Sequence, residues 1–242
     1  MAPLTDKNKK YGTLDELVSL TIEIDPEFIQ TCADFGASTD EAKTIYMKSR
    51  TYIQGVVGNK TPEDRIRQRC AVATGDISVA EIMEFRHSPV EAGVDAVLKG
   101  APIFVDINMV KSGITKMGHN CDVICVLDED KDAEIAKKYG ITRTAAGYLA
   151  SRDRLNGAII AIGNAPSAAI TICRLIEKGL RPALIVGTPV GFVNAAESKE
   201  MVRDLKIPVP SITCVGTRGG TPMAVACVNE IIAIANESKK NE

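Results

Sequence analysis

Three glycine-led turns carry the groups of this 242-residue chain that are best suited to bind an anionic ligand. They are residues 163–167 (GNAPS), 187–191 (GTPVG) and 216–221 (GTRGGT). Each turn follows a short apolar run and precedes a helical pattern, as a connection from a buried parallel strand to a helix does. Helix N-termini present unpaired N–H groups, and glycine lets a ligand approach the backbone. The three turns together predict a shared surface for carboxylate or phosphate groups, although any one alone is equally typical of a tight connection.

Two arginines lie beside glycine turns. Arg218 is inside the third turn, and Arg143 follows the Gly-Ile-Thr sequence at 140–142. A guanidinium group can bind a carboxylate through two parallel hydrogen bonds, so both are candidates for ligand recognition. For Arg143 a solvated surface position fits the sequence equally well. The Glu-Ser-Lys run at 197–199 begins a predicted helix, where it either faces the ligand or complements the helix dipole.

Groups that exchange protons near neutral pH are scarce in this sequence. His87 and His119 are its two histidines, and both have loop-like neighbours. Neither has the sequence context of a nucleophile elbow, so surface or structural roles are favoured. Cys121 and Cys125 share one face of a predicted strand, and no Cys-x-x-Cys pair or histidine cluster completes a metal site. We therefore expect no metal, and the glycine patterns give little support for a nucleotide.

Five short apolar runs separated by helical patterns form the framework that positions these groups. Such alternation predicts an α/β fold, a single domain with a mainly parallel five-stranded sheet flanked by helices. An N-terminal helical extension is expected at 1–38, and the α/β domain at 39–242. The predicted strands are 103–105, 122–127, 158–162, 183–186 and 211–215, and the main predicted helices are 39–57, 61–73, 89–99, 132–139, 144–155, 167–178, 195–205 and 221–235.

The composition limits the class of partner and the compartment. The 29 basic and 31 acidic residues give a formal charge of −2, so neither nucleic acid nor an anionic membrane is an expected partner. No apolar run has the length of a membrane span, and the lysine-rich start lacks the apolar core of a secretory signal. The expected location is the cytoplasm, and the seven cysteines favour core positions over a disulfide framework.

Several strings of this sequence resemble one known family, the precorrin-8X methylmutases, also called precorrin isomerases. The resemblance covers about residues 42–235. It implies an α/β fold with a parallel sheet, a homodimer and no cofactor. It also implies an intramolecular methyl transfer in cobalamin biosynthesis, from precorrin-8X or cobalt-precorrin-8, both polycarboxylate tetrapyrroles, to hydrogenobyrinate or cobyrinate. The strings are GAPI at 100–103, DINMV at 106–110, VIC at 123–125, GNAPS at 163–167, GTPVGFVNAAESK at 187–199 and RGG at 218–220.

The resemblance also implies individual site residues. Ser49 lies in a match to an early Arg-Ser-like motif, and Arg69 precedes a match to a His-Ala-Thr-Gly-Asp-like motif. The catalytic histidine that begins this second motif aligns with Val72. The full set of expected substrate-binding residues is Ser49, Arg50, Arg69, Thr74, Gly75, Asp76, Arg143, Thr144, Asn164, Ala165, Pro166, Ser167, Gly187, Pro189, Gly191, Glu197, Ser198, Lys199, Arg218, Gly219 and Gly220.

The valine at position 72 leaves the proton donor open, because valine cannot donate a proton. His87 or His119 is the fallback, from the same chain or across a dimer interface. Solvent or another donor is the second possibility. The alternative function is a tetrapyrrole-binding or carrier protein that binds the macrocycle with weak or no turnover. A nucleotide-dependent α/β enzyme is a third interpretation.

Overall fold

The structure is a computed structural model that describes residues 40–128 and 131–240. The chain divides into two units, residues 1–48 and 49–242. The described part of the first unit is the beginning of helix α3 (Asp40–Val57), and everything that follows concerns the second unit. The predicted N-terminal extension at 1–38 lies outside the described residues.

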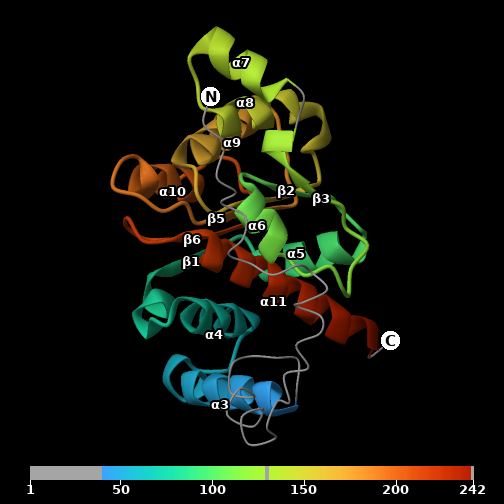
Figure 1. The fold of residues 1–242 in the computed structure, drawn as a ribbon, viewed down its shortest axis with the longest axis vertical. Helices are drawn as coiled ribbons and strands as arrows, with labels where there is room; N and C mark the ends of the chain where they lie inside the picture. Colours follow the sequence, from blue (N-terminus) through green and yellow to red (C-terminus); the bar gives the residue numbers. More distant parts are fainter. Residues whose placement is uncertain (1–39, 129–130, 241–242) are drawn as a thin grey trace, which may run out of the picture. The chain divides into compact units, whose positions relative to one another are not determined.

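A six-stranded sheet forms the centre of the second unit (Figure 1). The five predicted strands are present and run parallel to one another. The five-stranded prediction was nevertheless wrong, because β1 pairs antiparallel with β6 at one edge. A half-buried edge strand of four residues lacks the continuous apolar run that identifies the buried parallel strands. The spatial order is β1 (Met83–Arg86), β6 (Ser211–Cys214), β5 (Leu184–Gly187), β4 (Ile159–Ile162), β2 (Ile103–Val105) and β3 (Val123–Cys125).

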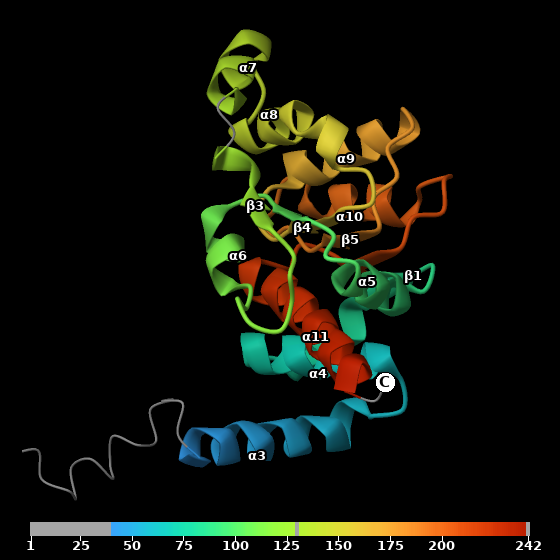
Figure 2. The same cartoon turned by 90° about the vertical axis from the view of Figure 1, so that its right-hand side faces the viewer.

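Helices cover both faces of the sheet, as two views at right angles show (Figures 1 and 2). Helices α8, α9 and α10 lie on one face, and α5, α6 and α11 lie on the other, with α4 packed against α11. None of the described helices is both long and apolar enough to cross a membrane. The helices are α4 (Pro62–Thr74), α5 (Pro89–Leu98), α6 (Asn108–Gly113), α7 (Asp132–Tyr139), α8 (Arg143–Ala150), α9 (Pro166–Glu177), α10 (Ala195–Arg203) and α11 (Thr221–Lys240), with 3₁₀ turns η1 (Ile77–Ile82), η2 (Val126–Asp128) and η3 (Arg152–Arg154).

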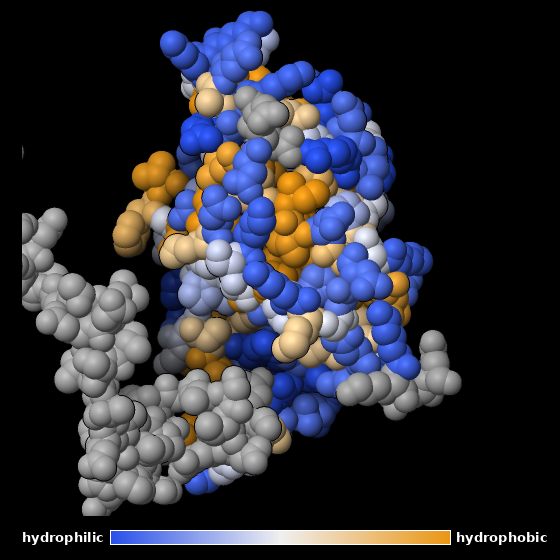
Figure 3. All heavy atoms as spheres, turned by 45° about the vertical axis from the view of Figure 1, so that its right-hand side comes forward, coloured by the Kyte–Doolittle hydropathy of each residue, from blue (hydrophilic) through white to orange (hydrophobic). Residues whose placement is uncertain are grey.

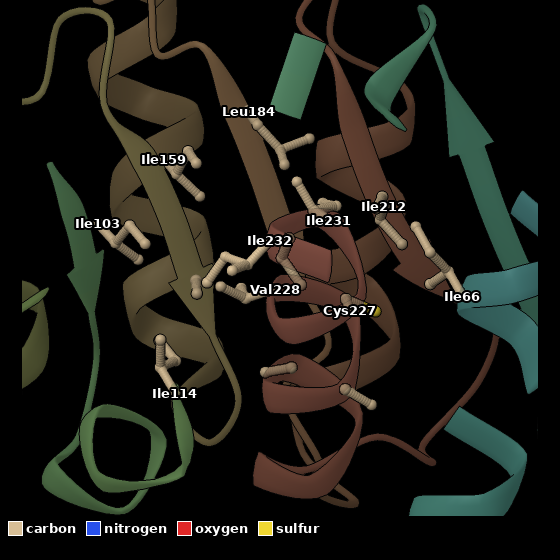
Figure 4. Packing of buried hydrophobic residues seen from close by; sticks show 14 of the residues in the cluster. Ile66, Ile103, Ile114, Ile159, Leu184, Ile212, Cys227, Val228, Ile231 and Ile232 are labelled. Atoms are coloured by element: carbon tan, nitrogen blue, oxygen red, sulfur yellow. The ribbon is translucent and has the colours of Figure 1, made fainter. Parts of the chain in front are cut away.

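The two sides of the sheet hold two separate apolar cores. Figure 4 shows Ile103, Ile159 and Leu184, from three neighbouring strands, on the side of Val228 and Ile231 of α11. The residues that alternate with them along the strands pack under α8, α9 and α10. Strands buried on both faces explain why the sequence shows continuous apolar runs and no alternation of apolar and polar residues.

Helix α4 begins and ends at residues whose local chemistry fixes its length. At the start, the Thr61 hydroxyl accepts from the N–H of Asp64, and the Asp64 carboxylate accepts from the N–H of Thr61, which forms a capping box. At the end, Gly75 adopts a left-handed conformation with φ 65° and donates its N–H to the carbonyl of Ala71. These ends place Val72 in the last turn of α4, directly before the segment that enters the candidate site.

Candidate active site

The carboxyl ends of the parallel strands carry the three predicted turns on one edge of the sheet. We call residues 163–167, 187–191 and 216–220 the rim. The N–H of Gly220 donates to the carbonyl of Thr188 at 2.7 Å, and the N–H of Gly191 donates to the carbonyl of Thr217 at 3.1 Å. The second and third turns therefore lie against each other, after β5 and β6. Ligands of open α/β sheets bind at this edge.

Arg218 is the cation that joins the rim to the end of helix α4. Its guanidinium donates to the carboxylate of Asp76 at 2.9 Å and to the hydroxyl of Ser78 at 2.7 Å. The hydrogen bonds from Ser78, with a weaker contribution from Arg218, hold the pKa of Asp76 below its usual range, although desolvation opposes them. The side chain of Arg218 is still 47% exposed, so it can meet a ligand from a fixed position. The structure thus brings two predicted site residues, Asp76 and Arg218, into direct contact.

Val72 precedes Asp76 by four residues, in the last turn of α4, and is partly buried. Thr74 is held locally, because its hydroxyl donates to the carbonyl of Cys70 at 2.9 Å. Position 72 thus belongs to the helix end that Arg218 attaches to the rim.

The two fallback histidines lie at the opposite edge of the sheet. Strand β1 is antiparallel to β6, and Arg86 pairs with Ser211, the first residue of β6. His87 therefore follows at the amino-terminal edge. His119 precedes β3 and uses both ring nitrogens, Nε2 with the carbonyl of Thr115 at 2.7 Å and Nδ1 with the N–H of Cys121 at 3.1 Å. Within one chain, neither histidine lies at the rim.

The first turn of the rim gives its N–H groups to a carboxylate of the protein itself. Asp106, which follows β2, is fully buried and accepts from the N–H groups of Gly163, Asn164 and Ala165 at 3.1, 2.7 and 2.8 Å. Burial raises the pKa of Asp106, and these hydrogen bonds oppose that effect. The N–H groups that the sequence offers to a ligand at this turn are thus engaged by Asp106.

The start of helix α8 borders the first turn. The hydroxyls of Thr142 and Ser167 are 2.7 Å apart, and Thr142 also caps α8. Arg143 donates to the carboxylate of Asp132 at 2.8 Å, yet its side chain remains 57% exposed. Thr144 is buried. Arg143 is therefore a second cation with an exposed side chain, beside the rim but paired with a carboxylate.

Two predicted site arginines face a buried carboxylate on α11 and not the rim. Arg50, Arg65 and Arg69 all donate to Glu230, at 2.8, 2.9 and 2.9 Å, and the Glu230 side chain is completely buried. Arg65 also pairs with Glu237. We call these three arginines with Glu230 the arginine cluster. Burial alone would raise the pKa of Glu230, but the hydrogen bonds and charges of its arginine partners outweigh burial and lower it.

The arginine cluster predicts a loss of stability in acid. The folded pKa of Glu230 lies below its unfolded value, which is about 4.5. Its contribution to stability is therefore fully present above pH 4.5 and is lost as the pH falls through the folded pKa. We expect the difference in free energy of unfolding between the wild type and Glu230→Gln to be constant from pH 7 to 6 and to shrink below pH 4.5. Urea unfolding at several pH values measures it, and a difference that grew in acid would contradict the assignment.

Of the Glu-Ser-Lys run, only the first residue is exposed. Glu197 borders a pocket of about 630 Å³ between α9 and α10. The hydroxyl of Ser198 is buried and donates to the carbonyl of Ala195 at 3.1 Å. Lys199 is completely buried, and its amine donates to the carbonyl of Arg218 and to the thiol sulfur of Cys214. Lys199 therefore supports the third turn from behind. Ser49 is an exposed residue of α3 and takes no part in the contacts described above.

Gly219 is required by the close contact between the second and third turns. Its φ is +157°, and a Cβ added there would lie 2.3 Å from the carbonyl oxygen of Thr188. We expect Gly219→Ala to cost more than about 2 kcal/mol, because backbone must move. The matched control is Gly216→Ala, at φ +77° with open space around the added Cβ, expected to cost about 1 kcal/mol. Thermal unfolding of both variants tests this, and equal losses would contradict the clash.

Apolar side chains extend the rim beyond its polar groups. Phe192 is 95% exposed, Val193 is 75% exposed, and Val190 is also exposed. Figure 3 shows an apolar projection at its left margin, where the loop between β5 and α10 lies in Figure 1. The rim and its borders thus combine one half-exposed cation in the rim, a second beside it and an apolar loop, which suits a large flat anion.

Two contributors to the site, Ser78 and Asp106, were missing from the prediction. Ser78 follows Asp76 closely, and an Asp-x-Ser turn was a signal for it. Asp106 directly follows a buried strand, which is a usual place for a functional polar group. Thr188 belongs to the predicted second turn, and its buried hydroxyl has no hydrogen-bond partner among the described residues, a property that only the tertiary structure reveals.

The described residues contain no group of three or more His, Cys, Asp and Glu side chains arranged to hold a metal ion. The six described cysteines are buried free thiols. Cys121 and Cys125 belong to the apolar core beneath α5, α6 and α11.

Comparison with known proteins agrees with this geometry. The family model described as precorrin-8X methylmutase matches residues 44–234. The chain is 40% identical over 214 residues to a cobalt-precorrin-8 methylmutase of Methanocaldococcus jannaschii, covering 84% of this chain and 99% of the relative. It is 35% identical to a precorrin-8X methylmutase of Pseudomonas aeruginosa, covering 79% of this chain and 95% of the relative.

A solved structure, titled as precorrin-8X methyl mutase from Thermus thermophilus, has the same fold with a TM-score of 0.75 and 30% identity. The match covers 81% of this chain and 97% of that structure. Sequence and fold agree over the whole region that contains the rim. The chain therefore belongs to the precorrin-8X methylmutase family, a family of isomerases in cobalamin biosynthesis.

Proposed function

We propose that this chain catalyses the intramolecular methyl transfer that its family name describes, converting precorrin-8X or cobalt-precorrin-8 to hydrogenobyrinate or cobyrinate. The observation that carries the proposal is the contact of Arg218 with Asp76 and Ser78, which places a half-exposed cation at the rim within the matched region. A tetrapyrrole with many carboxylates needs cations at its periphery and apolar surface against its ring.

The residues of the rim and those that border it have distinct roles in this proposal. Arg218 and Arg143 bind carboxylates at the edge of the macrocycle. Val190, Phe192 and Val193 contact the face of its ring. A methyl shift between neighbouring ring carbons neither adds nor removes atoms, so the protein acts by fixing the ring's conformation and protonation. Any cobalt in the ring is part of the substrate.

In this proposal, the lack of a proton donor at position 72 limits kcat. Because Val72 donates no proton and both histidines lie at the other edge, the wild type takes its proton from solvent or from another donor. We expect Val72→His to raise kcat by about 100-fold, the lower end for one added acid–base group. The pH profile should then gain an inflection near 6.5. Val72→Gln is the control, since it adds polarity without titrating, and an equal gain there would refute the acid–base explanation.

The activity itself is tested by mixing purified protein with each substrate form in turn. We expect the visible spectrum to change while the mass of the tetrapyrrole stays constant, which defines an isomerisation. The two forms, with and without cobalt, are run separately and identify the preferred one. If the wild type binds the tetrapyrrole tightly with an unchanged spectrum and only Val72→His converts it, the chain is a carrier protein and the proposed enzymatic function is wrong.

We also propose that the chain is a homodimer, on the family resemblance alone. Sedimentation velocity at micromolar concentration tests it. A dimer would permit a histidine of the partner subunit to reach the rim, whereas a monomer would contradict the dimer and leave solvent or a donor of the same chain.

A further inference from the structure

Lys199 is the most unusual charged group of the described structure. Its side chain is completely buried at the centre of α10, next to β6. A buried ammonium group normally pairs with a carboxylate, because the loss of hydration is costly. Within the described part of the chain, Lys199 forms no ion pair, and its amine donates to one carbonyl and one thiol. Burial accordingly lowers the pKa of Lys199, with Cys214 opposing that effect.

The amine of Lys199 and the thiol of Cys214 both donate to one backbone atom of the site. The carbonyl oxygen of Arg218 accepts from Lys199 and also from the thiol of Cys214, at 3.1 Å. The guanidinium of the same Arg218 reaches forward to Asp76. The backbone carbonyl of Arg218 is thus held by two buried side chains, and the guanidinium of Arg218 is held by Asp76 after the end of α4.

The backbone beside this peptide has two glycines on one side, and on the other side the carbonyl of Thr217 accepts from the N–H of Gly191 at 3.1 Å. Gly219 and Gly220, which follow it, have φ values of +157° and +114°, which L side chains rarely adopt. One hydrogen bond, from the N–H of Gly220 to the carbonyl of Thr188, joins them to the second turn. A glycine pair allows many other conformations, so the turn depends on its hydrogen bonds to stay in place.

We propose that Lys199 is the positioning residue for Arg218, so that a buried amine that never touches the substrate fixes the cation that binds it. The proposal rests on the proposed function, in which Arg218 binds a substrate carboxylate. It explains why a lysine occupies a fully buried site without a counter-ion. An aliphatic side chain of the same length would fill that site without the cost of desolvating an amine.

Lys199→Met separates positioning from packing, because methionine keeps most of the apolar stem and removes the amine. We expect the thermal midpoint to stay the same or to rise. We expect KM for the tetrapyrrole to rise about tenfold with kcat changed less than twofold, since a lost hydrogen bond to a charged donor is worth at least that factor. Lys206→Met, the same change at an exposed position after α10, is the control and should change neither.

A double-mutant cycle with Arg218→Met tests whether Lys199 acts through Arg218. If it does, Lys199→Met raises KM less than twofold further in the Arg218→Met background. Independent, multiplicative effects of the two substitutions would overturn the proposal. So would a fall in thermal midpoint with KM unchanged, which is the signature of a packing role.

Amide hydrogen exchange makes the test independent of turnover. In Lys199→Met the N–H groups of residues 216–220 should exchange at least tenfold faster than in wild type, because the tether of the Arg218 carbonyl is gone. If the wild type shows no turnover, the proposed function fails while this exchange result still decides the positioning role. Unchanged exchange in residues 216–220 would overturn the proposal.

Discussion

Replacing Glu230 with glutamine is expected to lower the free energy of unfolding by about 3 kcal/mol, because it removes one partner of a buried ion pair. Three guanidinium groups, of Arg50, Arg65 and Arg69, converge on this single buried carboxylate. Without its charge they repel one another. Since the cluster joins α3 and α4 to α11, the loss should reduce the stability of the whole second unit. Urea unfolding at pH 7 measures it.

Glu237→Gln is the matched control for this substitution. It makes the same chemical change on the same helix, at a carboxylate that also pairs with Arg65 but is 57% exposed. We expect a loss below about 1 kcal/mol there, because exposed ion pairs contribute little. Equal losses for the two variants would mean that burial of Glu230 does not matter, contrary to the structure.

Replacing Arg218 with methionine is expected to reduce kcat/KM by about 100-fold while leaving the fold intact. Arg218 is the half-exposed cation at the rim, so its loss removes a charged contact to the substrate and releases Asp76 and Ser78. Its ion pair with Asp76 is exposed on both sides, so we expect less than about 1 kcal/mol of lost stability. Steady-state kinetics together with thermal unfolding separates the two effects.

Arg174→Met is the control for Arg218→Met. Arg174 also pairs with a carboxylate, Glu177 at 3.0 Å, and is also exposed, but it lies in the last turn of α9, far along that helix from the rim. Its replacement should leave kcat/KM unchanged. A similar loss of activity in both variants would show a general effect of charge on binding and would remove Arg218 from the site.

Most helices and strands of this fold were predictable because the signals that identify them lie within short stretches of the sequence. Continuous apolar runs such as 158–162 identify strands buried on both faces, and capping residues such as Thr61 identify helix starts. Strand β1 was missed because a short, half-buried edge strand has no local signal of that kind. The three turns were also found locally, since glycine and proline mark the ends of strands.

The partners of the site residues were not predictable in the same way. Arg50 and Arg69 contact a glutamate on α11 that lies more than 160 positions later in the sequence. The run at 197–199 was expected either to face the ligand or to complement the helix dipole, and in the structure the Lys199 amine is buried and donates to the carbonyl of Arg218. A sequence pattern indicates which residues belong to a site, whereas the direction of each side chain follows from tertiary packing.

The proposed reaction moves a methyl group within one tetrapyrrole bound at this rim. A single turnover with substrate carrying ¹³C in the migrating methyl group tests it most directly. We predict that the labelled methyl resonance of the bound tetrapyrrole moves to the position of a methyl on the neighbouring ring carbon, with no label lost and no change in mass. A bound substrate whose labelled resonance stays at its original carbon would contradict the claim and leave a binding protein in its place.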